Sequence, residues 1–452
     1  MSDTHLPAGL ERRREDYPLI TGGAHYVDDL RSPQGRPTAL QMVVVRSPYA
    51  HADIKGIHLE TARALPGVVA AFAAEELIHD LPEMEIIPMP QSLKAPARKP
   101  LALQRARYVG DPLAVIVAEN LATALDARDL VDIDYQPLPS VTDPEAALAA
   151  DAPLLYDDLG SNTAFQTQIG GGDLADAFAH ASHRVHLRVV NQRVAPSSME
   201  PRACLFDFDP TSGEFSAWLS SQAIYSARET LAKCLGIDRE KVRVFNADVG
   251  GAFGTKGAFV GEELAAATLA VRLGRPVKWI ESRTENLQAQ TQGRGQVHYI
   301  EAAYQSDGQL LGLKVQTIAD LGAFLAQTTS MVPIITATML NGPYRIQAVQ
   351  SQVVGVFTNK APTGAYRGAG RPEATYILER TLDRIAHDLG LDPADVRRRN
   401  LIAPDAFPYQ TLTGGQYDSG NYQAALEEVL ELGNYAGWRA KQQEQRQQGS
   451  SR

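Results

Sequence analysis

Short apolar runs of strand length alternate with helix-like spacing along the first third of the chain. Three segments have the β-branched content or the alternation of strands: 39–47, 112–119 and 131–139. Apolar residues recur at helical spacing over 121–131, and Asn120 stands where a helix N-cap belongs. The pattern predicts a compact domain of mixed strands and helices over 19–138, preceded by a polar arm at 1–18.

A second, larger α/β region follows at 155–402, after a linker at 139–154 that is rich in Pro, Asp and Ala. Its strand patterns span 183–191, 213–220, 241–248, 276–282, 296–305, 310–320 and 350–357. Its helix patterns span 222–235, 259–273, 371–388 and 393–400. The remainder, 403–452, is helical by pattern over 421–448. The overall fold class is therefore α/β (α+β).

One long stretch without charged residues, 321–340, needs a separate interpretation. Several Gln, Thr and Ser residues interrupt it, so a buried segment is favoured over a membrane span. The N-terminal sequence MSDTHLPAGLERRRED has no apolar core of a signal peptide. We therefore expect a cytoplasmic protein with no membrane span.

Composition narrows the function classes. The 452 residues carry 43 basic and 53 acidic side chains, a net charge of −10, which argues against a general nucleic-acid binder. The two cysteines, Cys204 and Cys234, are too few for a disulfide framework, a four-cysteine zinc site or a four-cysteine iron–sulfur cluster. His180, His183 and His186 lack convincing metal-ligand spacing, because a strand would place the last two on opposite faces.

Two glycine-rich loops, each between a strand and a helix pattern, are candidate ligand sites. The first, 248–256 (DVGGAFGTK), lets backbone N–H groups approach an anion or oxo group, although a plain turn remains the alternative. It is not a P-loop, because Thr255 occupies the position of the required glycine. The second, 363–373 (TGAYRGAGRPE), lacks the third glycine of a dinucleotide fingerprint. Its Arg367 suits an anionic or carbonyl group, or else a buried structural ion pair.

A third candidate is Gln222 in the segment Ser220-Ser221-Gln222, where a strand pattern gives way to a helix pattern. A helix N-terminus favours anions, and the Gln222 amide can donate hydrogen bonds to a ligand. Taken alone, Gln222 suits helix capping better.

Together these segments resemble the large, molybdenum-cofactor subunit of the molybdenum hydroxylases, the family of xanthine oxidase, aldehyde oxidase and aerobic carbon monoxide dehydrogenase. The resemblance covers nearly the whole chain, in family order. It rests on RSPYAHADIKGI (46–57), YVGDPLAVIVAEN (108–120), SMEPRAC (198–204), SSQAIYSARETLAKCLGI (220–237), DVGGAFGTK (248–256), KAPTGAYRGAGRPEATY (360–376) and VRRRNLI (396–402).

The resemblance implies domains and site residues. It implies an a/b hammerhead domain at 19–138, a first molybdopterin-binding domain at 155–402, and the start of a truncated second one at 403–452. Gln222 is expected to hydrogen-bond an oxo ligand of molybdenum, so that no protein side chain ligates the metal directly. Gln222 and Arg367 are the expected catalytic residues. The expected cofactor-binding residues are Gln222, Gly250, Gly251, Ala252, Phe253, Gly254, Tyr366, Arg367, Gly368 and Ala369.

The resemblance also implies chemistry and partners. The family hydroxylates a carbon with oxygen from water, assisted by a carboxylate base and by preorganised hydrogen-bond donors. The cofactor is molybdenum–molybdopterin, with the cytosine dinucleotide form expected. Electrons leave through a small subunit with [2Fe–2S] clusters to a medium subunit with FAD. An aldehyde or an N-heterocycle is the expected small-molecule substrate.

Three departures from the family pattern qualify this expectation. No cysteine lies beside Arg367, which speaks against copper-linked carbon monoxide oxidation and leaves a carbon monoxide dehydrogenase-like subunit without the copper ligand as one alternative. Gly257 stands where xanthine-type enzymes carry a glutamate, so purine hydroxylation is disfavoured. The segment that carries the family's base glutamate is absent, and Glu200 and Glu373 do not correspond to that residue.

That absence leaves further alternatives. The chain is expected to be either a truncated product or one half of a split subunit that works with a separate C-terminal-half chain. A non-catalytic binding or assembly protein is a second hypothesis. An unrelated nucleotide-binding oxidoreductase is a third, which the incomplete fingerprint disfavours. We expect the chain alone to hold little molybdenum and to oxidise no aldehyde.

Overall fold

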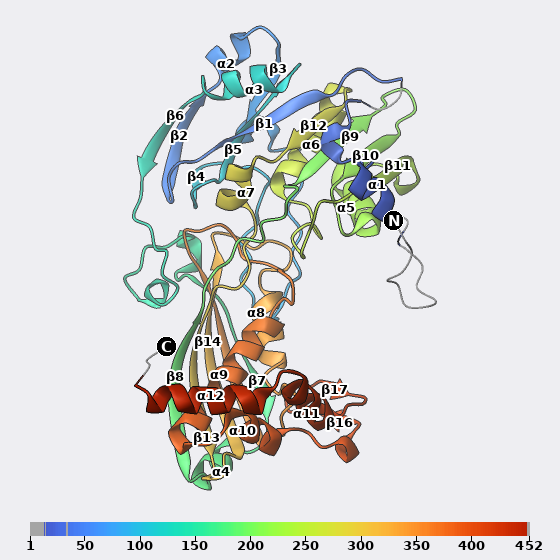
Figure 1. The fold of residues 1–452 in the computed structure, drawn as a ribbon. Coiled ribbons are helices and arrows are strands. Elements are labelled where there is room, and N and C mark those ends of the chain that lie inside the picture. Colours follow the sequence, from blue (N-terminus) through green and yellow to red (C-terminus); the bar gives the residue numbers. More distant parts are fainter. Residues whose placement is uncertain (1–12, 14, 33–34, 450–452) are drawn as a thin grey trace. The chain divides into compact units, whose positions relative to one another are not determined.

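The structure, a computed structural model, describes residues 13, 15–32 and 35–449 and divides into two compact units (Figure 1). Unit 1 comprises the residues up to Met84 together with Ala97–Leu138 and Pro196–Gln290. Unit 2 comprises Glu85–Pro96, Pro139–Ala195 and the residues from Thr291 onward. Both units draw on widely separated parts of the chain, so these spatial units differ from the sequence intervals expected above.

A seven-stranded sheet with the order β11-β10-β9-β12-β1-β5-β3 forms the centre of unit 1. Its strands are β1 (Leu40–Arg46), β3 (Val68–Ala73), β5 (Pro112–Ala118), β9 (Ala203–Phe208), β10 (Phe215–Leu219), β11 (Val242–Asn246) and β12 (Val277–Ile280). β1 pairs in parallel with β12 and antiparallel with β5. Every residue of β5 is buried, as expected of a continuous apolar run.

Helices and a small sheet complete unit 1. α6 (Gly261–Leu273) packs on β9 and β12 and is buried over most of its length, which fits its Ala- and Leu-rich sequence. α3 (Leu121–Arg128) packs on β1 and β5, and the Asn120 side chain caps it by accepting from Thr123 N at 2.9 Å, as predicted. The remaining elements are α1 (Asp16–Thr21), α2 (Glu60–Ala64), α5 (Ile224–Leu235), α7 (Arg283–Ala289) and the sheet β4-β2-β6 (Arg105–Ala106, Ala52–His58, Asp132–Pro137).

Unit 2 contains a five-stranded sheet with the order β7-β15-β14-β13-β8. Its strands are β7 (Thr163–Gly171), β8 (His183–Asn191), β13 (Gln296–Tyr304), β14 (Leu310–Gly322) and β15 (Ala348–Phe357). Alternate side chains point to opposite faces: Ile300, Leu313 and Val315 pack against helix α9 (Arg371–Leu389), whereas Tyr299 faces away from it. Figure 1 shows α9 and α8 (Met331–Thr338) across the sheet.

The remaining helices of unit 2 are α4 (Leu174–Ala179), α10 (Pro393–Asn400), α11 (Tyr422–Leu432) and α12 (Tyr435–Gln447), and β16 (Tyr409–Gln410) pairs with β17 (Gln416–Tyr417). The uncharged stretch 321–340 is largely buried, as expected, and contains α8. Within the described part of the chain, no helix has both the length and the apolar character needed to cross a membrane.

Candidate functional site

The loop between β11 and α6 is tied to unit 1 by the buried side chain of Lys256. Its ammonium donates to the main-chain oxygen of Glu200 (2.9 Å), to Glu200 Oε2 (3.0 Å) and to Ser220 Oγ (2.6 Å). Glu200 Oε2 also accepts from Gly250 N (2.8 Å) and Ser220 Oγ (2.6 Å). Burial lowers the pKa of Lys256, and the Glu200 carboxylate opposes that shift. One ion pair thus holds both ends of the glycine-rich loop.

Gln222 turns toward this same loop and does not cap a helix. α5 begins at Ile224, two residues later than the sequence pattern suggested. Its N-cap residue is Ala223, which makes no side-chain hydrogen bond to the first turn of the helix. The Gln222 side-chain oxygen accepts a hydrogen bond from Gly254 N at 2.9 Å. Among the described residues, no acceptor lies within hydrogen-bond distance of the Gln222 amide nitrogen, which leaves it available to a ligand.

The middle of the loop presents unpaired main-chain donors. Within the part of the chain that the structure describes, the N–H groups of Gly251, Ala252 and Phe253 make no hydrogen bond. Phe253 adopts a left-handed φ of 53° and leaves 42% of its surface exposed, an unusual state for a large aromatic residue. Gly254 has a φ of 102°. Consecutive free N–H groups in such a conformation form a cradle for an anion or oxo group.

The C-terminal side of the loop, next to Lys256, is held in addition by Arg202, which the sequence patterns did not single out. This buried guanidinium donates to the main-chain oxygens of Ala258 (3.1 Å) and Thr255, and it pairs with Glu263 (2.8 Å). Burial raises the pKa of Glu263, and Arg202 opposes that shift. Burial also raises the pKa of Glu281, which accepts from Arg202 N at 2.9 Å, to about 7.

In unit 2 the second glycine-rich loop connects β15 to α9. Gly364 N donates to Gln292 O and Ala365 N donates to Thr328 Oγ1, each at 2.9 Å. Gly368 and Ala369 both have positive φ, 98° and 41°, so the loop turns sharply after Arg367.

The Arg367 side chain is exposed and makes no ion pair or hydrogen bond within the described ranges. The alternative of a buried structural ion pair therefore does not describe this arginine. An exposed guanidinium without a partner instead remains available to a ligand.

A second arginine, Arg294, holds this loop through hydrogen bonds to its main chain. Its role was not recognised from the sequence. Arg294 donates to the main-chain oxygens of Tyr366 (3.2 Å) and Arg367 (2.9 Å). Its guanidinium also lies over the Tyr366 ring, 4.9 Å from the centroid. The buried carboxylate of Glu373 lies 3.6 Å away. A signal was present, since Arg294 stands between two glycines, but such a tripeptide alone does not identify a role.

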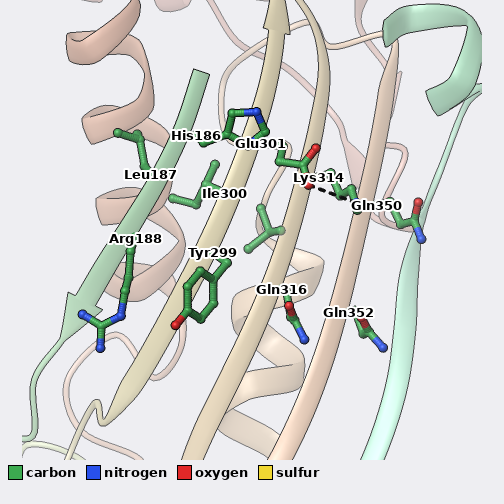
Figure 2. Close-up of a pocket in the computed structure, with 11 residues that line it drawn as sticks. His186, Leu187, Arg188, Tyr299, Ile300, Glu301, Lys314, Gln316, Gln350 and Gln352 are labelled. Atoms are coloured by element: carbon green, nitrogen blue, oxygen red, sulfur yellow. Dashed lines mark hydrogen bonds and ion pairs between the residues drawn. The ribbon is translucent and has the colours of Figure 1, made fainter. Parts of the chain in front are cut away.

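A polar groove lies on the face of the unit 2 sheet that points away from α9 (Figure 2). Its charged side chains are paired within the protein: Lys314 contacts Glu301 at 3.1 Å, and Arg188 contacts Glu145. His186 also lines this groove, whereas His183 hydrogen-bonds Ser306, so β8 places them apart as expected. No group of three or more potential metal-ligating side chains occurs in the described parts of the chain. None of the site residues expected from the sequence lines the groove.

Comparison with known proteins gives these loops a context. Residues 155–401 match the family profile of the molybdopterin cofactor-binding domain, and residues 21–139 match that of the aldehyde oxidase and xanthine dehydrogenase a/b hammerhead domain. The chain therefore belongs to the molybdenum hydroxylase large-subunit family, in which the xanthine dehydrogenase-type oxidoreductases are grouped. The expected fold, a hammerhead domain followed by a molybdopterin-binding domain, is confirmed.

Particular relatives make the match more concrete. The carbon monoxide dehydrogenase large chain of Hydrogenophaga pseudoflava is 37% identical over 454 residues, with 96% of this chain and 55% of that relative covered. The crystal structure of quinoline 2-oxidoreductase from Pseudomonas putida 86 is 33% identical with a TM-score of 0.91, covering 97% of this chain and 55% of that one. The nicotinate dehydrogenase large molybdopterin subunit of Eubacterium barkeri is 27% identical, covering 85% and 90%. The chain thus spans about half the length of the first two relatives.

Proposed function

We propose that this chain is the molybdenum-cofactor-binding part of an oxidoreductase that hydroxylates an aldehyde or N-heterocycle carbon with oxygen derived from water. The observation that carries the proposal is the set of unpaired donors on the two glycine-rich loops. Each loop belongs to a segment that resembles the family's cofactor-contacting sequence, and each is braced by buried charged groups. The bound cofactor would supply the redox centre and the water-derived oxygen.

The chain's own residues would bind the cofactor and orient it. In unit 1, the amide nitrogen of Gln222 would donate to an oxo group, as would the N–H groups from Gly251 to Phe253, while Gly250 and Gly254 keep the loop in shape. Such groups fit an oxo-rich anionic cofactor because they are donors with no competing acceptor. We assign the general base to no carboxylate of this chain.

In unit 2, Arg367 would stabilise negative charge that develops on the substrate, since its guanidinium is exposed and unpaired within the described residues. Tyr366, Gly368 and Ala369 would contact the cofactor or substrate as parts of the same loop. No metal ligand from a protein side chain is required, because all these contacts are hydrogen bonds.

The substrate class follows from the relatives and from the loop. Quinoline and nicotinate, named in two relatives, are N-heterocycles, which makes this class the favoured one. The carbon monoxide dehydrogenase relative suggests a different substrate. However, Cys204 lies buried in β9 and Cys234 lies in α5, so neither is in the Arg367 loop to bind copper.

We further propose partners and domain limits. An FAD-binding medium subunit and a [2Fe–2S] small subunit would receive the electrons. We propose the intervals 1–18 (arm), 19–138 (hammerhead), 139–154 (linker), 155–402 and 403–452, the cytosine dinucleotide cofactor and a cytoplasmic location.

The test is purification of the tagged chain from its own host, with whatever chains accompany it. Elemental analysis for molybdenum and iron, flavin fluorescence and mass spectrometry of the co-purified chains are then compared with the chain produced alone. We expect about one molybdenum per chain in the complex and little in the isolated chain. A complex that contains neither molybdenum nor flavin would overturn the proposal in favour of a non-catalytic assembly protein.

Variants of Arg367 test the site itself. Arg367→Met in the purified complex is expected to lower kcat/KM for quinoline- or nicotinate-like substrates by about 100-fold or more, because a charge-stabilising donor is lost. Arg380→Met is the matched control, since Arg380 is an exposed arginine of α9 whose side chain, within the described ranges, forms an ion pair only with Asp383, at 3.7 Å. Equal activity of the two variants would remove Arg367 from the proposed site.

A further inference from the structure

We infer that Arg294 is a positioning residue that fixes the loop carrying Tyr366 and Arg367. This inference rests on the proposed function, because the loop matters only if it contacts cofactor or substrate. Arg294 itself is largely buried, with 13% of its side chain exposed, and it reaches the loop from beneath. It therefore acts through the loop and not on a ligand.

The contacts of Arg294 are unusually complete for one side chain. Two separate nitrogens of its guanidinium donate to two consecutive main-chain oxygens, those of Tyr366 and Arg367, and the same plane lies over the Tyr366 ring. A planar guanidinium can satisfy all three contacts at once. A lysine ammonium carries a comparable charge but lacks the forked geometry, so the conservative replacement is not equivalent.

The local backbone is shaped to bring Arg294 to this place. Arg294 has a φ of 66°, a left-handed conformation that residues other than glycine seldom adopt. A side chain at the preceding Gly293 would place its Cβ 2.6 Å from the Cβ of Tyr366. The segment therefore runs directly against the loop, and only glycine fits at 293. An unfavourable conformation retained next to a candidate site is typical of a functional constraint.

A buried carboxylate compensates the charge of Arg294. Glu373, in the first turn of α9, is fully buried, and its nearest oxygen lies 3.6 Å from the guanidinium. Among the described residues, neither oxygen of Glu373 has a hydrogen-bond partner. The carboxylate thus balances the charge of Arg294 without competing for its hydrogen bonds, and the loop oxygens receive them instead.

Limited trypsin digestion tests this inference without any cofactor. Trypsin cleaves after arginine, and the peptide bond between Arg367 and Gly368 carries the very oxygen that Arg294 holds. In the full-length chain, Arg294→Met is expected to speed cleavage at Arg367–Gly368 by about tenfold, because local opening exposes that bond. Arg294→Lys is expected to give an intermediate cleavage rate. The rates are measured by mass spectrometry of the fragments over time.

Arg188→Met is the matched control for this digestion. Arg188 is an ion-paired arginine of the same sheet, but it lies in the groove on the opposite face. Its cleavage pattern at Arg367 should equal that of the wild type. If Arg294→Met leaves the rate at Arg367 unchanged, or accelerates cleavage at Arg380 equally, Arg294 has no specific role in the loop and the inference is wrong.

The purified complex separates this inference from the proposed function. There, Arg294→Lys is expected to lower kcat by about 10- to 100-fold with molybdenum content unchanged, since a misplaced loop misaligns Arg367. An unchanged kcat in a complex with full molybdenum would overturn the positioning role. If the complex lacks molybdenum but the Arg294→Met chain still shows selective cleavage, the proposed function fails while Arg294 remains the brace of the loop.

Discussion

The glycine-rich loop of unit 1 is held by a hydrogen-bonded ion pair, Lys256–Glu200, whereas the loop of unit 2 is held by hydrogen bonds from the Arg294 side chain to its main-chain oxygens. We call each of these sets of contacts the brace of its loop. Lys256 and Glu200 lie 3.0 Å apart, and each makes further hydrogen bonds to Ser220 or Gly250. Arg294 and Glu373 lie 3.6 Å apart, and only the arginine makes hydrogen bonds among the described residues. In one brace both charges hold the loop, and in the other only the cation does.

This difference has energetic consequences. Removing one partner of a buried, hydrogen-bonded ion pair leaves an uncompensated charge and unpaired donors, which costs several kcal/mol. Removing the charge of a carboxylate that makes no hydrogen bond costs far less, because no donor loses its acceptor. The two braces are therefore expected to respond very differently to the loss of one charge.

The largest effect is expected for Lys256→Met. It leaves the Glu200 carboxylate, whose side chain is only 14% exposed, without its cation, so that only Ser220 and Gly250 still donate hydrogen bonds to it. We expect a loss of about 3 kcal/mol in the free energy of unfolding, measured by urea denaturation. Lys241→Met is the control, since Lys241 is exposed and its side chain, among the residues that the structure describes, hydrogen-bonds only to the main-chain oxygen of Ser212. The free energy of unfolding of this control should stay within about 0.5 kcal/mol of the wild type. A loss below about 1 kcal/mol for Lys256→Met would show that the ion pair is not the brace.

A smaller effect is expected from two alanine substitutions in the same loop. A Cβ on Gly250 would lie 2.5 Å from the Cβ of Glu200, so Gly250→Ala should push the carboxylate away and cost about 1–3 kcal/mol. On Gly257 the nearest atom to a Cβ, Gly254 O, lies 3.7 Å away, so Gly257→Ala should change stability by less than about 1 kcal/mol. The free energies of unfolding of the two variants are compared by urea denaturation. Equal values would mean that the loop can shift away from Glu200 without cost, so that the close approach at Gly250 is not required.

Much of the fold was accessible from local pattern. The strand predicted at 183–191 coincides with β8, and the helix predicted at 393–400 coincides with α10. Both candidate loops lie between a strand and a helix as predicted. Such agreement arises where apolar spacing and capping residues act over short distances.

Other elements could not be predicted from the local sequence pattern, for physical reasons. β7 contains three consecutive polar residues, Gln166, Thr167 and Gln168, followed by Ile169 and two glycines, so its sequence lacks the alternation of a strand although it pairs with β15. The pairing of β1 with β12 joins residues more than 200 positions apart, and no local periodicity encodes such a partner. The helical tail at 421–448 divides into α11 and α12, because Gly433 and Asn434 interrupt it.

The candidate site also contains residues that the sequence allowed us to predict and residues that it did not. The loops and Gln222 were recognised because their glycines and their family-like order are visible along the chain. The ion pairs that hold the loops were not recognised. Lys256 meets Glu200 across 56 positions, and β13, β14, α8 and β15 lie between Arg294 and Glu373 in the sequence. Charged residues at such separations show their role only after folding has brought them together.

The smallest effect, and the sharpest test of the comparison, is expected for Glu373→Gln. Burial raises the pKa of Glu373, and Arg294 only partly opposes that shift. The folded chain thus binds this proton more tightly than the unfolded chain does, so ionisation of Glu373 lowers stability as the pH rises above about 4.5. Glutamine cannot ionise, and any gain over the wild type should appear at neutral pH and vanish toward pH 4. We expect changes within about 1 kcal/mol throughout, from thermal unfolding at several pH values. A loss above about 2 kcal/mol at pH 7 would mean that the Glu373 carboxylate holds its loop as firmly as Glu200 holds the other, and the contrast between the two braces would be wrong.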